Sequence, residues 1–331
     1  MKLKRIILII AALLVALVCL SSCEKNNDTT KPTGDTYYTV TFKFNSEQAD
    51  YAVQVKRNEL IPAPISPERE NYIFNGWKNE GKIWDFTKDT VYADITFTAQ
   101  WIDASTIFSY AVNTDGTITV TGYNGSLTEI RIPEVISGLT VTAIADEAFK
   151  GLDDLDVTLI TIPKTVTSVG RSAFEGCDYM PITVLGTLSY VGEQAFDGCV
   201  GLNPVTLDSS LDKISFRAFA ECLLFTEIKI PQSVTVIEED AFSGCEFAQT
   251  MLIMSTDFTV EDSAFAGCDN LVTIFYIGSE AEWETVLSKV NDGGNGNDNL
   301  RGADVFFYAE TEPMSEGNFW HFNDKGQPRC W

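Results

Sequence analysis

A repeat of about 23 residues is the feature that most constrains how this chain of 331 residues can fold. The pair Ala-Phe recurs six times, at spacings of 25, 22, 23, 23 and 23 residues. The six phenylalanines are Phe149, Phe174, Phe196, Phe219, Phe242 and Phe265. A fixed period of about 20 to 50 residues is the signature of a repeat architecture, so each copy is interpreted as one unit of a stack.

Three further positions keep the same register in all six copies. Three residues after each Phe stands a Cys, or a Leu in the first copy: Leu152, Cys177, Cys199, Cys222, Cys245 and Cys268. Five residues before each Phe stands a β-branched residue: Ile144, Val169, Val191, Ile214, Ile237 and Val260. Six residues after it stands an apolar residue: Leu155, Met180, Leu202, Phe225, Ala248 and Leu271. This alignment predicts one buried face in each unit.

The apolar residues after each Cys follow the spacing Leu-x-x-Ile-x-Ile, as in residues 225–230 and 271–276. A unit this short cannot bury its own apolar face, but stacked units can, because their parallel strands lie about 4.8 Å apart. The sequence therefore predicts a mainly β solenoid of about six repeats of 22 to 25 residues. In it, Phe and Cys form continuous internal columns.

The pattern IPxxVTxIxxxAFxxCxxL is similar to that of the BspA-like leucine-rich repeat family of bacterial surface proteins. The resemblance is clearest at residues 160–177 and 228–245, and it covers roughly residues 107 to 331. It implies a leucine-rich-repeat solenoid over residues 104–277. Residues 182–188 lack the Pro, and residues 250–265 carry extra apolar side chains around their strand. These departures bring the evenness of the concave surface into question.

The segment before the repeats, residues 37–103, has strands that alternate apolar and polar residues at both of its ends. Residues 64–101 are similar to the Listeria-Bacteroides repeat known from internalin-type proteins, through the motifs Gly-Trp, Trp-Asp-Phe and Ala-Gln-Trp. The resemblance implies a small β-grasp-like domain. Its Trp77, Trp84 and Trp101 have two interpretations, as the core of the domain or as a platform for a glycan.

Capping segments are expected at both ends of the solenoid, because an end unit has no neighbour to cover its apolar side. Residues 105–133 predict a hairpin with its turn at residues 114–116, which leads into the first repeat. At the other end Trp283, Val286, Leu287 and Val290 share one helical face. Residues 278–331 are therefore predicted to form a C-terminal helix and cap.

The chain begins with basic residues and an apolar run of 15 residues at 6–20, a pattern typical of a secretory signal. A transmembrane anchor is the alternative, although a span needs about 20 residues. The sequence LSSC at 20–23 resembles the bacterial lipobox, which implies removal of signal peptide 1–22 and acylation of Cys23. Residues 23–36 then form a polar tether.

The residues Glu24 and Lys25 after the acylated Cys partly resemble the surface-export signal of Bacteroides-type lipoproteins. These resemblances imply an outer membrane lipoprotein that is exposed on the cell surface. It contacts the membrane through its N-terminal lipid anchor only.

The formal charge of −24 becomes −27 once the three basic residues of the signal are removed. Such a field repels nucleic acid and anionic lipid, so neither is expected as a partner. Without Cys19 and Cys23, six cysteines remain, of which five form the repeat column. We predict that these five are reduced packing thiols, and the alternative is disulfide bonding between rungs.

Catalytic chemistry is not indicated by any motif. His321 is the only imidazole, which argues against most catalytic triads and His-based metal sites. Residues 291–298 are rich in Asn, Asp and Gly but lack the spacing of a calcium loop, so they are predicted to form a solvated loop. We predict that the protein is not an enzyme and binds no cofactor or metal.

The outward-facing column of the strands runs from polar to apolar: Thr161, Thr183, Thr206, Lys229, Leu252 and Phe275. Lys229, Leu252 and Phe275 are therefore the predicted partner-binding residues, as part of an exposed patch on the concave sheet. The alternative is that the C-terminal cap covers Phe275. The leading hypothesis is a non-enzymatic surface adhesin for a protein ligand. A glycan-binding accessory of a nutrient-uptake system and a structural surface-layer component are the alternatives.

Overall fold

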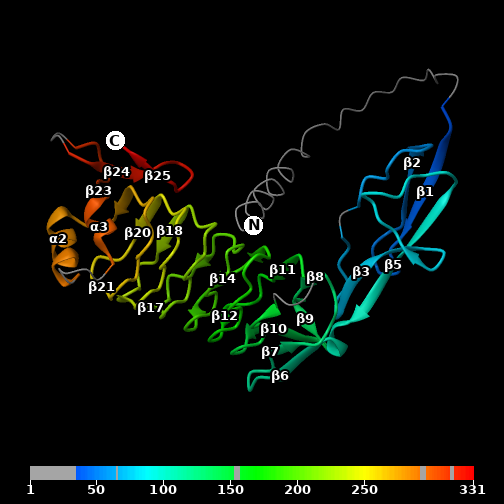
Figure 1. Ribbon diagram of the computed structural model, residues 1–331, viewed down its shortest axis with the longest axis horizontal. Helices are drawn as coiled ribbons and strands as arrows, with labels where there is room; N and C mark the ends of the chain where they lie inside the picture. Colours follow the sequence, from blue (N-terminus) through cyan, green and yellow to red (C-terminus); the bar gives the residue numbers. More distant parts are fainter. Residues whose placement is uncertain (1–34, 65, 153–156, 291–295, 314–316) are drawn as a thin grey trace. The chain divides into compact units, whose positions relative to one another are not determined.

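The computed structural model describes residues 35–64, 66–152, 157–290, 296–313 and 317–331 (Figure 1). The predicted signal peptide, Cys23 and all but the last two residues of the predicted tether lie outside these ranges. The described chain divides into two compact units. The first runs to Ile107 and includes Val135–Gly138, and the second holds Phe108–Glu134 and Leu139–Trp331. The exact domain limits given above remain predictions.

The first unit is a five-stranded mixed sheet in the order β2-β1-β5-β3-β4. Its central strands β1 and β5 are parallel, and the other neighbours are antiparallel. This arrangement agrees with the implied β-grasp-like fold. The strands are β1 (Tyr37–Lys43), β2 (Tyr51–Lys56), β3 (Tyr72–Asn79), β4 (Lys82–Ile83) and β5 (Ile95–Asp103), followed by the 3-10 helix η1 (Ala104–Thr106).

The core of the first unit is aromatic. Phe42 and Phe44 lie on the same face of the sheet, because residues two apart in an extended strand point the same way. Both rings pack edge-on against Trp77, at centroid distances of 5.0 and 5.1 Å. Trp77 is only 3% exposed, and Trp101 donates its indole N–H to the carbonyl of Phe44 at 2.9 Å. Trp84 and Trp101 pack against the same cluster. The core interpretation of the tryptophans is confirmed.

The second unit opens with the hairpin of β6 (Phe108–Val112) and β7 (Ile118–Tyr123). Gly116 in its turn has a φ of 83°, a conformation that glycine adopts without steric cost. Strand β7 pairs in parallel with β10, the first short strand of the repeats. The predicted N-terminal capping hairpin is therefore confirmed.

The repeats then contribute strands to two sides, seen as green to yellow rungs in Figure 1, and the side whose strands mostly have three or four residues is called the long-strand side. The strands on the long-strand side are β8 (Glu129–Arg131), β11 (Leu159–Ile162), β13 (Ile182–Val184), β14 (Thr187–Leu188), β16 (Thr206–Leu207), β18 (Glu227–Ile230), β20 (Thr250–Ile253) and β22 (Thr273–Tyr276). Those on the other side are β9 (Val135–Ile136), β10 (Leu139–Ile144), β12 (Ser168–Val169), β15 (Tyr190–Val191), β17 (Lys213–Ile214), β19 (Val236–Ile237) and β21 (Thr259–Val260).

The predicted phenylalanine column is continuous through all six repeats. Successive ring centroids lie 5.1, 5.4, 5.8, 5.4 and 5.5 Å apart, and the ring planes differ by 1 to 9°. These distances are close to the spacing of about 4.8 Å between neighbouring strands, so each ring stacks on the ring of the preceding rung. The mainly β solenoid is confirmed.

The five cysteines of the column are buried thiols, not disulfides. Each Sγ lies 3.1 to 3.3 Å from the carbonyl oxygen of the column Phe in the preceding rung, as Cys245 does from Phe219 at 3.2 Å. The thiol therefore fills a small apolar site and donates a weak hydrogen bond between rungs. The packing role was predicted, whereas this hydrogen bond was not.

The long-strand sheet is interrupted near its middle. A strict period of 23 residues would pair Thr206 with Thr183, but Thr206 pairs instead with Thr187 in a separate two-stranded ladder. The shift begins before this strand, because Ile182 of the preceding rung forms its bridge with Leu202. The outward column is therefore uneven at Thr206, next to residues 182–188, where the departure from the repeat pattern had brought its evenness into question.

The C-terminal end is closed by α2 (Glu280–Lys289), α3 (Asp298–Gly302) and the strands β23 (Asp304–Tyr308), β24 (Phe319–Phe322) and β25 (Pro328–Cys330). Ser279 and Glu282 form a capping box at the start of α2. Trp283 is 3% exposed and contacts Tyr276 at a centroid distance of 5.2 Å. The predicted closing helix is confirmed.

Asn297 and Asn299 terminate the columns with their side chains. Asn297 accepts the backbone N–H of Phe265 at 2.9 Å and donates to the carbonyl of Glu261 at 2.8 Å. Asn299 donates to the carbonyl of Phe265 at 2.6 Å. The prediction of a solvated loop is wrong for Asn297, which is 1% exposed, because the last rung has no following rung to accept its N–H groups.

Candidate binding surface

The outward residues of the last long strands lie in register across the sheet. Lys229 on β18 is opposite Leu252 on β20, which is opposite Phe275 on β22, and Phe275 is opposite Phe306 on β23. The structure therefore brings together the three predicted binding residues as one row.

Their exposure differs from the prediction. Lys229 is exposed and pairs with Glu227 at 3.0 Å, but Leu252 is only 7% exposed. Phe275 is half-buried, with the rings of Phe306 and Trp320 both 5.7 Å from its own. The predicted exposed apolar patch is wrong, and the alternative that the cap covers Phe275 is confirmed.

The covering element is the β24–β25 hairpin, drawn in red near the C-terminus in Figure 1. Its Trp320 is fully buried, contacts Tyr308 and Phe322 at 5.2 and 4.8 Å, and donates its indole N–H to the carbonyl of Tyr276 at 2.9 Å. Trp320 reaches Phe275 although β23 lies between their strands, so the sheet curls inward at this end. The aromatic residues of the tail were the sequence signal for this cover.

The outward residues of β8, β11 and β13, and that of β18 beyond the interruption, are polar: Arg131, Thr161, Thr183 and Lys229. Arg131 pairs with Glu129 at 3.1 Å, in the same way that Lys229 pairs with Glu227. Between these pairs Thr183 accepts a hydrogen bond from the amide of Asn203 at 2.7 Å. Exposed ion pairs of this kind contribute about 0 to 1 kcal/mol to stability. Arg131 and Lys229 can therefore leave their carboxylate partners and pair with a binding partner, with only a small loss of stability.

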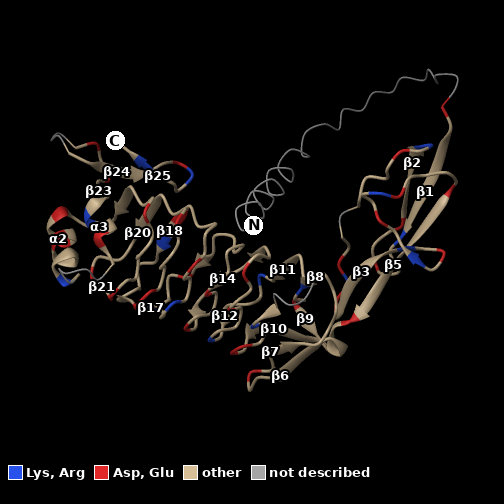
Figure 2. Cartoon of the chain, in the orientation of Figure 1, with Lys and Arg blue, Asp and Glu red and all other residues tan. Residues whose placement is uncertain are grey.

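Acidic residues gather at the turns that follow the short strands. Glu238, Glu239 and Asp240 follow β19, and Glu261 and Asp262 follow β21 in the next rung. Figure 2 shows acidic residues along this edge, near β17 and β21. Lys229 and Arg131 are therefore cations on a strongly acidic molecule. A partner that carries both acidic and basic groups fits this distribution better than a uniformly anionic one.

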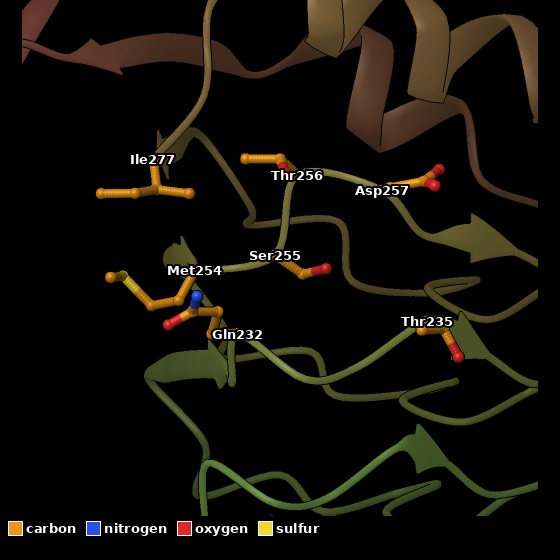
Figure 3. Close-up of a pocket in the computed structure, with 7 residues that line it drawn as sticks. All are labelled: Gln232, Thr235, Met254, Ser255, Thr256, Asp257 and Ile277. Atoms are coloured by element: carbon orange, nitrogen blue, oxygen red, sulfur yellow. The ribbon is translucent and has the colours of Figure 1, made fainter.

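A hollow of about 450 Å³ lies between the loops after β18, β20 and β22 (Figure 3). It is lined by Gln232, Thr235, Met254, Ser255, Thr256, Asp257 and Ile277. Met254 and Ile277 in this lining stand at the position that Pro231 occupies in its repeat. The lining brings in one carboxylate, Asp257, which pairs with Lys289 at 2.8 Å.

Next to the hollow, the hydroxyl of Tyr276 donates to the carbonyl of Thr256 at 3.1 Å. Burial raises the pKa of Tyr276 to about 12, so this hydroxyl stays protonated at neutral pH. The hollow thus has no pair of titratable groups arranged for acid–base chemistry in the part of the chain that the structure describes.

His321 has a structural environment. Its ring stacks on Trp331 with centroids 3.9 Å apart, and its Nδ1 lies 3.1 Å from the carbonyl of Phe322. Within residues 35–331, leaving out the gaps given above, no group of three or more His, Cys, Asp or Glu side chains is placed to hold a metal ion. None of the described helices is long and apolar enough to cross a membrane.

Comparison with protein families gives two matches. The model of the BspA type leucine rich repeat region matches residues 122–222 and 178–284, in six copies. The chain carries a BspA-type leucine-rich repeat region. The model of the Listeria-Bacteroides repeat domain matches residues 38–100, just before the BspA-type repeats. Both resemblances found in the sequence are therefore confirmed.

The curated relatives share short regions with this BspA-type repeat chain. Internalin H of Listeria monocytogenes is 42% identical over 82 residues, which are 24% of this chain and 14% of the relative. A putative Gly-rich membrane protein of Evansella cellulosilytica is 36% identical over 67 residues, 19% of this chain and 8% of the relative. The chain thus matches less than a sixth of the length of either relative.

Solved structures similar to the BspA-type repeat chain are leucine-rich repeat proteins. One from Bacteroides ovatus is 32% identical, with a TM-score of 0.46, and the match covers 51% of this chain and 45% of that one. One from T. pallidum is 24% identical, with a TM-score of 0.45, and the match covers 57% of this chain and 96% of that one. Because both TM-scores are below 0.5, the fold assignment rests on the repeats themselves.

Proposed function

We propose that this protein is a non-enzymatic cell-surface adhesin that binds a protein partner on the long-strand face of its repeats. The single observation that supports this most is that the outward cations on both sides of the interruption, Arg131 on β8 and Lys229 on β18, are exposed, whereas Phe275 on β22 is covered by Trp320 of the hairpin. Stacked repeats present such extended faces, and partners dock along them.

The residues that we assign to binding differ from those predicted from the sequence. Leu252 is buried and Phe275 is half-buried against Trp320 of the hairpin, so Lys229 is the exposed member of the predicted set. Arg131, Thr161 and Thr183 extend the surface toward the N-terminal rungs. Cation-bearing polar surfaces of this kind give specificity and orientation through paired charges.

We further propose that the chain is held at the outer membrane, facing outward, by a lipid on Cys23. This proposal draws on the lipobox-like sequence at 20–23 and on the similarity to Internalin H and to a putative Gly-rich membrane protein. A tether between the lipid and the first unit gives the repeats freedom to reach a partner.

Affinity capture on the intact chain, followed by a glycan array, tests the proposed function. We expect a protein partner that is captured by the wild-type chain and by Arg171→Glu, whose guanidinium lies at a turn, but not by the Arg131→Glu, Lys229→Glu double variant. A sugar ligand with no protein partner would favour the glycan-binding alternative. Capture of only the chain itself would favour a surface-layer component.

A further inference from the structure

The two edges of the first unit differ in how they are protected. Unpaired edges of a sheet expose N–H and C=O groups that can pair with another strand, and proteins blunt them with short strands, bulges, prolines or charges. One edge strand, β4, has only two residues, Lys82–Ile83. The other, β2, has six residues without Pro, its register with β1 is uninterrupted from Tyr51 to Lys56, and its one charged residue, Lys56 at the end of the strand, is paired with Asp35. The edge at β2 is therefore a template for pairing.

The pairing between β1 and β2 identifies the backbone groups that point away from the sheet. Arg57 donates its N–H to the carbonyl of Thr36 at 2.9 Å, so these opposed residues are a hydrogen-bonded pair. Opposed residues in an antiparallel ladder alternate between hydrogen-bonded and non-hydrogen-bonded pairs. Ala52, Gln54 and Lys56 consequently direct their N–H and C=O groups to the open side of β2.

Burial of the side chains is incomplete at β2, the edge of the sheet. Val55 is 6% exposed, but Tyr51 remains 40% exposed although its ring stacks on Phe42 at 5.0 Å. Ala52 and Gln54 are exposed. A strand added beside β2 would cover the rims of Tyr51 and Val53 and satisfy the outward backbone groups.

We propose that β2 pairs antiparallel with β2 of a second copy of this chain, about a two-fold axis at Gln54. The strand is self-complementary in this register, because Gln54 lies opposite Gln54, Val53 opposite Val55 and Ala52 opposite Lys56 of the other copy. No like charges are opposed. Tyr51 lies opposite Arg57, which favours a cation–π contact of the kind that Arg69 makes with Tyr72 in this unit, 3.9 Å from the ring centroid.

The pairing gives a continuous sheet across the two-fold axis, with the same patch used on both copies, as closed two-fold symmetry requires. It is independent of the proposed adhesion, because it uses the first unit and leaves the long-strand face of the repeats unused. Lys56, which pairs with Asp35 at 2.9 Å, remains able to keep that ion pair beside Ala52 of the other copy.

Cysteine cross-linking of the full chain in intact cells tests the pairing. The variant is Gln54→Cys in a Cys330→Ser background, since Cys330 is an exposed thiol. Opposed residues in a hydrogen-bonded antiparallel pair have Cα atoms about 5.5 Å apart, within the range of a disulfide. The matched control is Thr41→Cys, which lies opposite Ala52 one strand further into the sheet.

We expect a disulfide-linked band at twice the chain mass for Gln54→Cys, at least tenfold stronger than for Thr41→Cys. Adding Ala52→Pro should reduce the band at least tenfold, because Pro removes an outward N–H of β2 without removing a bond to β1. Equal bands for Gln54→Cys and Thr41→Cys would overturn the proposal. So would a band of any other mass, which would identify a foreign strand as the occupant, or a dimer that Ala52→Pro does not change.

Discussion

The Phe and Cys columns explain at the scale of single residues why six copies hold the same register. A ring that stacks at 5.1 to 5.8 Å on the next ring fills a space that a smaller side chain leaves empty. The site beside each ring accommodates only a small side chain, and the Cys thiol there reaches the Phe carbonyl of the preceding rung. Sequence spacing predicted the columns because burial imposes a strict period. It did not predict the thiol contact, since a small buried residue could equally have been Ala.

Truncating a ring of the column should be more damaging than truncating a thiol. Phe242→Ala leaves a cavity between two stacked rings, so we expect the free energy of unfolding to fall by about 3 to 5 kcal/mol. Cys245→Ala should cost less, because it removes one small group and a weak hydrogen bond. Urea denaturation of both variants measures the difference. An equal loss for Cys245→Ala, reproduced in the wild type by a reductant, would point to disulfides instead.

The buried thiols should also make stability fall at alkaline pH. Burial raises the pKa of Cys222 well above its ordinary value of 9.0, so the folded thiol stays neutral while the unfolded one ionises. Its contribution is fully present below pH 9 and is lost as the pH rises further. Each such thiol adds a slope of about 1.4 kcal/mol per pH unit. Urea denaturation between pH 8 and pH 11 should show that the free energy of unfolding falls less steeply with pH in Cys222→Ala than in the wild type. Equal slopes in the two proteins would mean that the Cys222 thiol is not held neutral by the fold.

The ends of the solenoid show, at the scale of elements, which parts a sequence reveals. Helix α2 was predictable because Trp283, Val286 and Leu287 repeat on one helical face and are all buried. The cover of β22 by the β24–β25 hairpin was not. Residue spacing identifies strands in the tail, but it does not say whether the sheet continues flat or curls until Trp320 meets Phe275. The interruption at β16 also lay beyond the repeat pattern, which keeps its period across this strand although Thr206 pairs with Thr187.

Leu252 is buried next to the covered Phe275, and Lys229 on its other side provides the control. Leu252→Asp places a charge at a site that is 7% exposed, so we expect it to lower the free energy of unfolding by more than about 2 kcal/mol. Lys229→Asp, one strand away in the same row, should change it by less than about 1 kcal/mol. Thermal unfolding distinguishes them. Equal midpoints for the two variants would mean that Leu252 is not buried.

Asn297 should be the main polar stabiliser of the C-terminal end. Asn297→Ala leaves the backbone N–H of Phe265 and the carbonyl of Glu261 without these partners in a buried site. We expect a loss of about 1 to 3 kcal/mol. The neighbouring Asp298→Ala, at an exposed position, is the control and should change little. Hydrogen exchange at Phe265 N–H adds a local readout, and unchanged protection there in Asn297→Ala would argue against the cap.

The whole molecule combines two units whose sequence signals differ in strength. The repeats and the small β-grasp-like unit were both predictable, because a 23-residue period and a set of Trp motifs each correspond to one fold. The binding surface was predicted only in part. Leu252 and Phe275 were predicted to bind a partner because outward apolar residues often form docking patches. In the structure Leu252 is buried and Phe275 packs against Trp320 of the cap. The exposed outward residues are instead Arg131 and Lys229.

The equilibrium binding of the captured partner to three versions of the intact chain tests the central claim most directly. The versions are the wild type, the Arg131→Glu, Lys229→Glu double variant, and the turn variant Arg171→Glu. We expect Kd to rise at least 30-fold for the double variant, about 2 kcal/mol, and to change less than threefold for Arg171→Glu, with all three melting within a few degrees of one another. A double variant that is folded and binds as tightly as the wild type would contradict the account and exclude the long-strand face as the binding surface.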